Sequence, residues 1–187
     1  MIPPLFRRSP KRTIAVLYGA IVAQARNQRF YQDYAVPDTV LGRFDLIVLH
    51  LSLVLRRLRE GDHAARIVAQ GVFDEFCRDM DHNLREMGIS DPGVPRQMRK
   101  VGEAFYGHAK AYDAALAAGG EDALTQALSR NVYAESAEPH VAAVRLAAYV
   151  RYVVEALAAQ PFEELARGPL HFSEPTAALA SAAESLR

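Results

Sequence analysis

Hydrophobic residues recur every three or four positions along most of the chain, which is the spacing of an α-helix with one buried face. Alternating patterns that would indicate strands are short and nearly absent, and valine and isoleucine fall inside the helical repeats. Proline and glycine interrupt these repeats and mark helix ends. The pattern therefore predicts an all-α fold, a single-domain bundle of about six main helices.

The first two predicted helices are separated by a proline-containing turn. The first covers about residues 13–30, and the threonine at its start is a good N-cap residue. Residues 36–39 (Val-Pro-Asp-Thr) then stop the chain, and either Asp38 or Thr39 can cap the next helix. That second helix, about residues 40–60, is apolar on nearly every side, so we expect it to be the most buried element.

Four further amphipathic segments follow, and turns rich in proline and glycine separate them. Two glycines, Gly102 and Gly107, interrupt the second of these segments, and we expect another helix to pack closely against them. The residues from Asp91 to Pro95 form a predicted turn. The four segments cover about residues 62–87, 98–116, 124–132 and 139–160.

The two ends of the chain differ from the helical domain, which we place at residues 13–172. Residues 1–12 form a basic N-terminal segment with four lysines and arginines. From Ser173 the composition drifts to proline, alanine, serine and glutamate, which predicts a mobile tail over residues 173–187. The longest apolar stretch, residues 44–55, is well short of the roughly 20 residues that span a bilayer. The predicted location is the cytoplasm, with transient contact at the inner face of the cytoplasmic membrane as an extension of it.

Charge narrows the choice of partners. Lys plus Arg and Asp plus Glu both total 22, so the formal net charge is zero and nothing indicates direct binding of nucleic acid. The distribution is uneven, because residues 1–60 carry 10 basic and 4 acidic groups and the remainder carries 12 and 18. This asymmetry can orient a partner or hold the fold together.

Residues that support catalysis or metal binding are few. Cys77 is the only cysteine, so thiolate zinc sites are excluded, and its apolar neighbours favour a core position. A di-iron bundle needs two Glu-x-x-His motifs, and the single copy at residues 60–63 has a glycine inside it. His50 lies on the most apolar helix and is expected to be a hydrogen-bonded core histidine. We predict no metal, no cofactor and no enzyme activity; a haem- or metal-handling enzyme using His50, His82 and the acidic residues near it is the alternative.

A series of short segments occurs in a specific order and spacing. In that order the segments resemble the ubiquinol-cytochrome c chaperone family, closely over residues 13–116 and more loosely in the later helices. They are Tyr18-Gly19, Gln24-Ala25-Arg26, Phe30-Tyr31, Val36-Pro37-Asp38-Thr39, Gly42-Arg43-Phe44-Asp45, Leu49-His50-Leu51, Phe73-Asp74, Asp79-Met80-Asp81, Leu84-Arg85-Glu86-Met87-Gly88 and Glu103-Ala104-Phe105-Tyr106-Gly107. His108 stands where the resemblance leads us to expect arginine in many relatives.

The resemblance implies an assembly chaperone without catalytic turnover. A bacterial member would bind newly synthesised cytochrome b and promote assembly of the ubiquinol-cytochrome c reductase, complex III of the respiratory chain. Mitochondrial relatives work with a small helical partner and contact the ribosome, so both are candidate partners here. An adaptor for a different membrane-protein client is the alternative within the same class of protein.

A client-binding surface is expected to combine aromatic and charged side chains, because these provide most binding energy and orientation. For four of the aromatic residues, Phe44, Phe73, Phe105 and Tyr112, core packing is favoured. Some charged candidates also have a purely structural explanation: Asp38 as a helix cap, and Arg43 with Asp45 or Arg85 with Asp81 as ties between helices. The candidate client-binding residues are Arg26, Tyr31, Asp38, Arg43, Asp45, Asp81, Arg85 and Tyr106.

Overall fold

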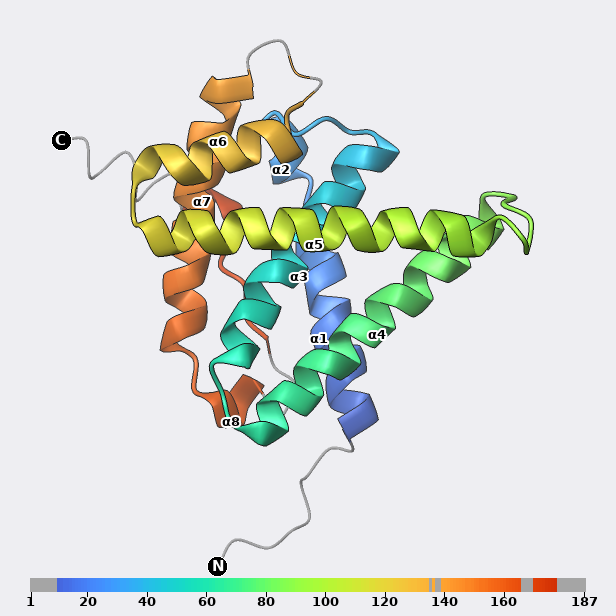
Figure 1. Cartoon of the computed structure of the whole chain (residues 1–187). Coiled ribbons are helices and arrows are strands. Elements are labelled where there is room, and N and C mark those ends of the chain that lie inside the picture. The colour runs from blue at the N-terminus through green and yellow to red at the C-terminus, as the bar shows by residue number, and fades with distance from the viewer. Residues whose placement is uncertain (1–9, 135, 137–138, 166–169, 178–187) are drawn as a thin grey trace, which may run out of the picture.

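The computed structural model describes residues 10–134, 136, 139–165 and 170–177. Every regular element within these residues is a helix, which confirms the all-α prediction (Figure 1). The helices are α1 (Pro10–Ala25), α2 (Arg29–Gln32), α3 (Val40–Arg59), α4 (His63–Glu86), α5 (Val94–Ala118), α6 (Glu121–Asn131), α7 (Pro139–Ala159) and α8 (Phe162–Leu165).

The central element is α3, which packs against α1, α4, α5 and α7. Of its 20 residues, 13 are buried, as the apolar pattern predicts. Its start is fixed by Thr39, whose Oγ1 accepts a hydrogen bond from the Gly42 amide at 3.0 Å. Of the two predicted cap residues, Thr39 is therefore the one that caps.

Two long helices diverge from a turn that lies away from the centre of the molecule (Figure 1). α4 ends at Glu86, the turn passes through Gly88, whose φ is +83°, and α5 begins at Val94. α5 then crosses in front of α3, with α6 packed beside it and α7 behind. From their turn, α4 and α5 diverge toward α3. The surfaces of these three helices therefore adjoin in the angle between α4 and α5.

Several helix boundaries differ from the predicted ones. The first helix begins at Pro10, because proline is well tolerated in a first turn, and ends at Ala25. Thr13 is therefore inside the helix, 2% exposed, and is not its cap. A separate short helix, α2, follows over Arg29–Gln32. The same tolerance of proline places Val94 and Pro95, predicted as turn, in the first turn of α5.

The expected close packing at two glycines of α5 is wrong. A Cβ atom added to Gly102 or Gly107 would find no heavy atom of another element within 4 Å. A glycine that does pack closely against another helix is Gly71 of α4, where an added Cβ would overlap the Ile14 side chain of α1. A periodic pattern shows that α5 has an apolar face, but it does not show which glycine lies on the covered face.

The packed body extends beyond residue 172. Tyr34 Oη donates a hydrogen bond to the Pro175 carbonyl at 2.6 Å, and Gln24 Nε2 donates one to the Ser173 carbonyl at 3.1 Å. The first residues of the predicted tail are therefore fixed to α1 and to the segment after α2. Residues 178–187 of that tail, and residues 1–9 of the basic segment, lie outside the described residues. Among the helices of the described part, none is long and apolar enough to cross a membrane.

Replacement of Gly42 by alanine is expected to destabilise the fold by about 2 kcal/mol or more, because an added Cβ would overlap the Pro37 carbonyl group. Chemical denaturation monitored by circular dichroism measures the change. Gly102→Ala is the matched control, since its Cβ meets nothing and alanine favours the helix by up to about 1 kcal/mol. Equal stability of the two variants would contradict this packing.

Candidate functional site

Four of the eight candidate residues come together where α1, α2 and α3 meet. Arg43 Nε and Asp38 Oδ1 form an ion pair at 2.7 Å, with the two side chains 60% and 55% exposed. Burial raises the pKa of Tyr31, and the nearby charges of Arg43 and Arg26 act in the opposite direction. We call Arg26, Tyr31, Asp38 and Arg43 the α2–α3 cluster. It combines one partly buried aromatic ring with two exposed cations and one exposed anion.

Asp81 and Arg85 lie at the far end of α4. Arg85 Nε pairs with Asp81 Oδ2 at 2.7 Å, and the same guanidinium also pairs with Asp91 in the turn before α5. Hydrogen bonding by Arg85 lowers the pKa of Asp81 below its usual value. Arg85 therefore connects α4 to the turn before α5. The helical spacing of Asp81 and Arg85 did not indicate that Asp91 takes part in this contact.

Asp45 is a wrong prediction as a client-binding residue, because its side chain is buried, with the residue 3% exposed. Its Oδ1 lies 3.8 Å from Nδ1 of His108 on α5, and Arg43 pairs with Asp38 instead. Burial lowers the pKa of His108, which occupies the position where arginine was expected. Because α3 is apolar on nearly every side, its sequence pattern does not show which of its polar residues face the core.

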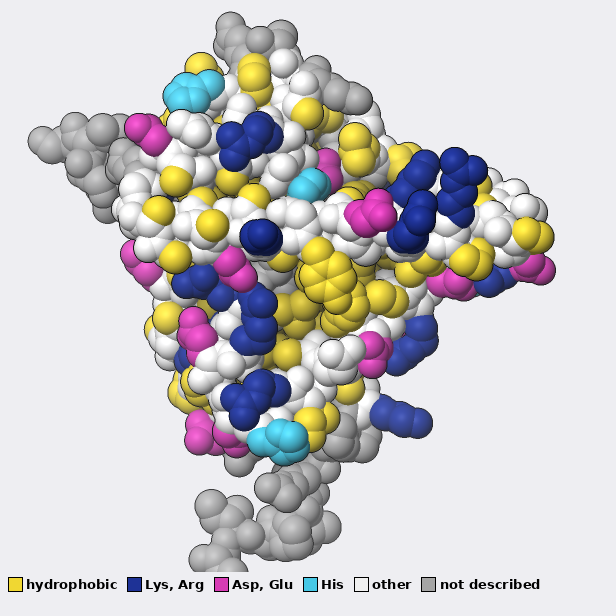
Figure 2. Space-filling view, viewed as in Figure 1, with side chains coloured by type: hydrophobic (Ala, Val, Ile, Leu, Met, Phe, Trp, Pro, Cys, Tyr) yellow, Lys and Arg dark blue, Asp and Glu magenta, His cyan; other side chains and the backbone are white. Residues whose placement is uncertain are grey.

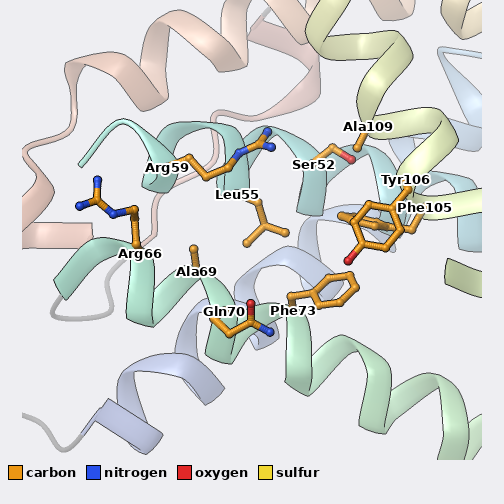
Figure 3. A pocket seen from close by; sticks show the side chains of 10 residues that line it. All are labelled: Ser52, Leu55, Arg59, Arg66, Ala69, Gln70, Phe73, Phe105, Tyr106 and Ala109. Carbon is orange, nitrogen blue, oxygen red and sulfur yellow. The ribbon is translucent and has the colours of Figure 1, made fainter. Parts of the chain in front are cut away.

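Tyr106 lines a groove between α3, α4 and α5. Hydrophobic side chains gather in the angle below α5, with Lys and Arg side chains along one side of them (Figure 2). This α3–α5 groove has a volume of about 270 Å³. Its lining residues are Ser52, Leu55 and Arg59 of α3, Arg66, Ala69, Gln70 and Phe73 of α4, and Phe105, Tyr106 and Ala109 of α5 (Figure 3).

Aromatic rings form one end of the α3–α5 groove (Figure 3). The ring of Phe73 lies 4.9 Å from that of Phe105 and 5.7 Å from that of Tyr106, measured between centroids. Phe105 is buried, as predicted, and Phe73 is partly buried. Tyr106 is 63% exposed, so a large aromatic surface remains open to a partner.

Arginines form the other end of the groove. Asp113 pairs with Arg59 at 2.7 Å and with Arg56 at 3.3 Å, so one carboxylate serves two guanidinium groups. Arg66 donates a hydrogen bond to the Gly61 carbonyl at 3.1 Å. Neither Arg59 nor Arg66 was among the predicted site residues. A signal for Arg66 exists, because it shares the helical spacing of Ala69, Gln70 and Phe73 on one face of α4.

His50 is a hydrogen-bonded core residue, as predicted. Its Nδ1 lies 2.7 Å from the Leu46 carbonyl and its Nε2 lies 2.8 Å from the hydroxyl of Tyr149. Since the carbonyl can only accept, Nδ1 carries the proton and Nε2 accepts from Tyr149. Gln24 Nε2 completes the chain by donating to the same hydroxyl at 2.9 Å. Burial lowers the pKa of His50 from 6.5 to about 4.

The remaining candidates for chemistry are dispersed. His82 pairs with Glu86 on the exposed face of α4 at 3.1 Å. Cys77 is half-buried beside the core, and burial raises the pKa of its thiol. Across the residues that the structure describes, no group of three or more His, Cys, Asp or Glu side chains is arranged to hold a metal ion.

The fold and the groove define a single-domain all-α protein with an aromatic surface hollow between three helices. Residues 32–172, more than half of the chain, match the family model described as ubiquinol-cytochrome C chaperone. The chain therefore belongs to this family, which confirms the resemblance found in its sequence segments.

Relatives from animals and a bacterium support the assignment. The chain is 26% identical to the ubiquinol-cytochrome-c reductase complex assembly factor 1 of Xenopus laevis over 164 residues, which are 87% of this chain and 82% of that protein. It is 24% identical to the protein of that name from Drosophila melanogaster, over 82% of this chain and 61% of that one. A crystal structure of the Cbp3 homolog from Brucella abortus is 42% identical, with a TM-score of 0.80 and coverage of 94% and 98% of the two chains.

The buried histidine predicts a dependence of stability on pH. Between about pH 6.5 and pH 4 the unfolded chain protonates His50 while the folded chain does not, so the unfolded state binds more protons and stability falls as pH falls. The full loss is about 3 kcal/mol. Urea unfolding at pH 7 and pH 4.5 measures it, with His50→Gln as the variant that lacks this titration. An equal loss in both proteins would exclude His50 as the source.

Proposed function

We propose that this protein binds newly synthesised cytochrome b and promotes assembly of the ubiquinol-cytochrome c reductase, complex III, without catalytic turnover. The observation that carries the proposal is the match of residues 32–172 to the chaperone family, because this region contains α3, α4 and α5 with their groove. The assembly role in the printed names of the animal relatives agrees with it.

The described surface suits binding of another protein. Tyr and Arg side chains provide a large share of the energy in protein interfaces, and rim charges orient the partners. The α2–α3 cluster supplies an exposed Arg43 with a partly buried Tyr31, and the α3–α5 groove supplies Tyr106 with two arginines. Both features are available without a rearrangement of the core.

Location and further partners follow from the client. A cytoplasmic protein that meets a membrane-inserted client would work at the inner face of the membrane. The basic N-terminal segment could contribute about 1 kcal/mol for each residue close to anionic headgroups, which is enough for transient contact. A ribosome or a small helical assembly partner would bring the chaperone to its client during synthesis. We propose no cofactor and no direct contact with nucleic acid.

A haem- or metal-handling enzyme is the less favoured function. Both ring nitrogens of His50 already make hydrogen bonds inside the core, and His82 pairs with Glu86 on the surface. A ligand at His50 would have to displace Tyr149 or break the bond to Leu46. No observation on the described residues favours that exchange.

Affinity capture of the tagged chain from respiring cells, followed by mass spectrometry, is expected to recover cytochrome b. Arg43 and Arg85 lie in separate regions of the surface, so each arginine is replaced in a separate variant. We expect Arg43→Glu to lower recovery about fivefold, equivalent to roughly 1 kcal/mol, since it removes a cation and places a second negative charge beside Asp38.

The charge-matched control is Arg130→Glu, on the exposed surface of α6, which should leave recovery unchanged. Circular dichroism checks that each variant is folded. Absence of cytochrome b from the wild-type capture, even after crosslinking, would overturn the proposed function and indicate an adaptor with another client. Normal recovery with Arg43→Glu would remove only the α2–α3 cluster from the binding surface.

A further inference from the structure

We propose that the α3–α5 groove is the docking site for an apolar helix of the client, and that an acidic residue near one end of this helix meets Arg59 and Arg66. This inference rests on the proposed function, because it takes the client to be a membrane protein with apolar helices. It goes further by naming the surface and the chemistry of the segment that the surface receives.

The shape of the groove fits side chains from a helix better than a small molecule. Small-molecule sites are usually concave cavities of about 300–1,000 Å³ that enclose most of their ligand. The α3–α5 groove is smaller, at about 270 Å³, and lies open between three helices (Figures 2 and 3). A helix that lays its apolar face into such a groove can insert a few side chains while its backbone stays outside.

Small residues leave room along the α5 wall. Gly102, Tyr106 and Ala109 share one face of α5 because they are spaced by four and three residues. Gly102 does not line the groove itself, but a Cβ atom added to it would meet nothing within 4 Å, so the surface of α5 is open one turn from Tyr106. Ala69 on α4 is similarly short and lines the groove. Another helix can therefore approach this face of α5 closely.

Charge distinguishes the two ends of the groove. At the arginine end, Arg56 and Arg59 share the carboxylate of Asp113, and Arg66 donates a hydrogen bond to the Gly61 carbonyl without an ion pair among the described residues. Lys110 follows Ala109 on α5 and adds a further exposed cation. The excess of positive charge beside apolar walls complements an apolar segment with a negative charge near one end. An acidic residue on the segment would give Arg66 a carboxylate partner, which it lacks among the described residues.

Photocrosslinking tests the occupant directly. Tyr106→p-benzoylphenylalanine places the photoreactive group at the groove, and Val144→p-benzoylphenylalanine places it on an exposed part of α7. In respiring cells we expect cytochrome b crosslinks from position 106 at least fivefold more often than from position 144. A crosslinked dimer of this chain, or crosslinks to phospholipid alone, would overturn the inference.

Filling the groove tests it without removing a contact. Ala109 lines the groove, so Ala109→Leu places a larger side chain in it, and we expect at least a fivefold loss of captured cytochrome b. Gly107→Leu is the matched control, because it adds the same side chain to the same helix at an exposed position with no neighbour within 4 Å. At the arginine end, Arg66→Glu should reduce capture, whereas Arg66→Lys should retain most of it.

The outcomes separate the two proposals. If the wild-type chain captures no cytochrome b, the proposed function fails. If the wild-type chain captures cytochrome b and folded Ala109→Leu and Arg66→Glu variants capture it equally well, the function stands and the groove is not the docking site. Loss of capture in both variants, together with crosslinking from position 106, supports the docking site.

Discussion

α3 is buried on nearly every side, and the positions of the other main helices follow from that burial. α1, α4, α5 and α7 all pack against it, so a shift of α3 would disturb four interfaces together. Its register is fixed at the start by the cap of Thr39 and by the close approach of Gly42 to the Pro37 carbonyl. A buried helix with a fixed start leaves its neighbours few alternative positions, because core side chains interdigitate at high density.

Burial of a helix on all sides also encloses polar groups, which must find partners within the core. His50 is 0% exposed and bonds to Leu46 and Tyr149, and Tyr149 accepts from Gln24 of α1. One hydrogen-bonded chain thus joins α1, α3 and α7. The segment after α8 closes over the same region, where Phe172 packs edge-on against the His50 ring at 5.4 Å. His50 therefore has a structural role in the core, and the candidates for binding are residues on the surface.

Much of the fold could be predicted from the sequence, because helix ends carry local chemical signals. Thr39 and Asp62 act as the N-caps that their residue types predict, and α7 begins at Pro139 as expected. Contacts between distant segments carry no such signal. The hydrogen bond from Tyr18 to Asp79, at 2.6 Å, joins two segments that contribute to the family resemblance, yet neither residue was predicted to meet the other.

The candidate site was less predictable, because exposure depends on tertiary packing. Charged residue types led to Arg43 and Asp38, which form an exposed pair, but also to the buried Asp45. The groove arginines were missed because a cation on an amphipathic helix is ordinarily part of a solvated face. What distinguishes Arg66 is its neighbour across the groove, Arg59 on α3, and that proximity exists only after folding.

The groove itself depends on how the aromatic residues hold α4 and α5 apart. Phe76 is fully buried and contacts Phe73 and Phe105, with ring centroids 6.1 and 5.8 Å away, so these rings fill the space between the middle parts of the two helices. Two further residues that line the groove are short, Ala69 on α4 and Ala109 on α5. These small side chains leave part of the space between the two helices unfilled. An open hollow beside rigid rings is thus a direct result of the same packing that stabilises the fold.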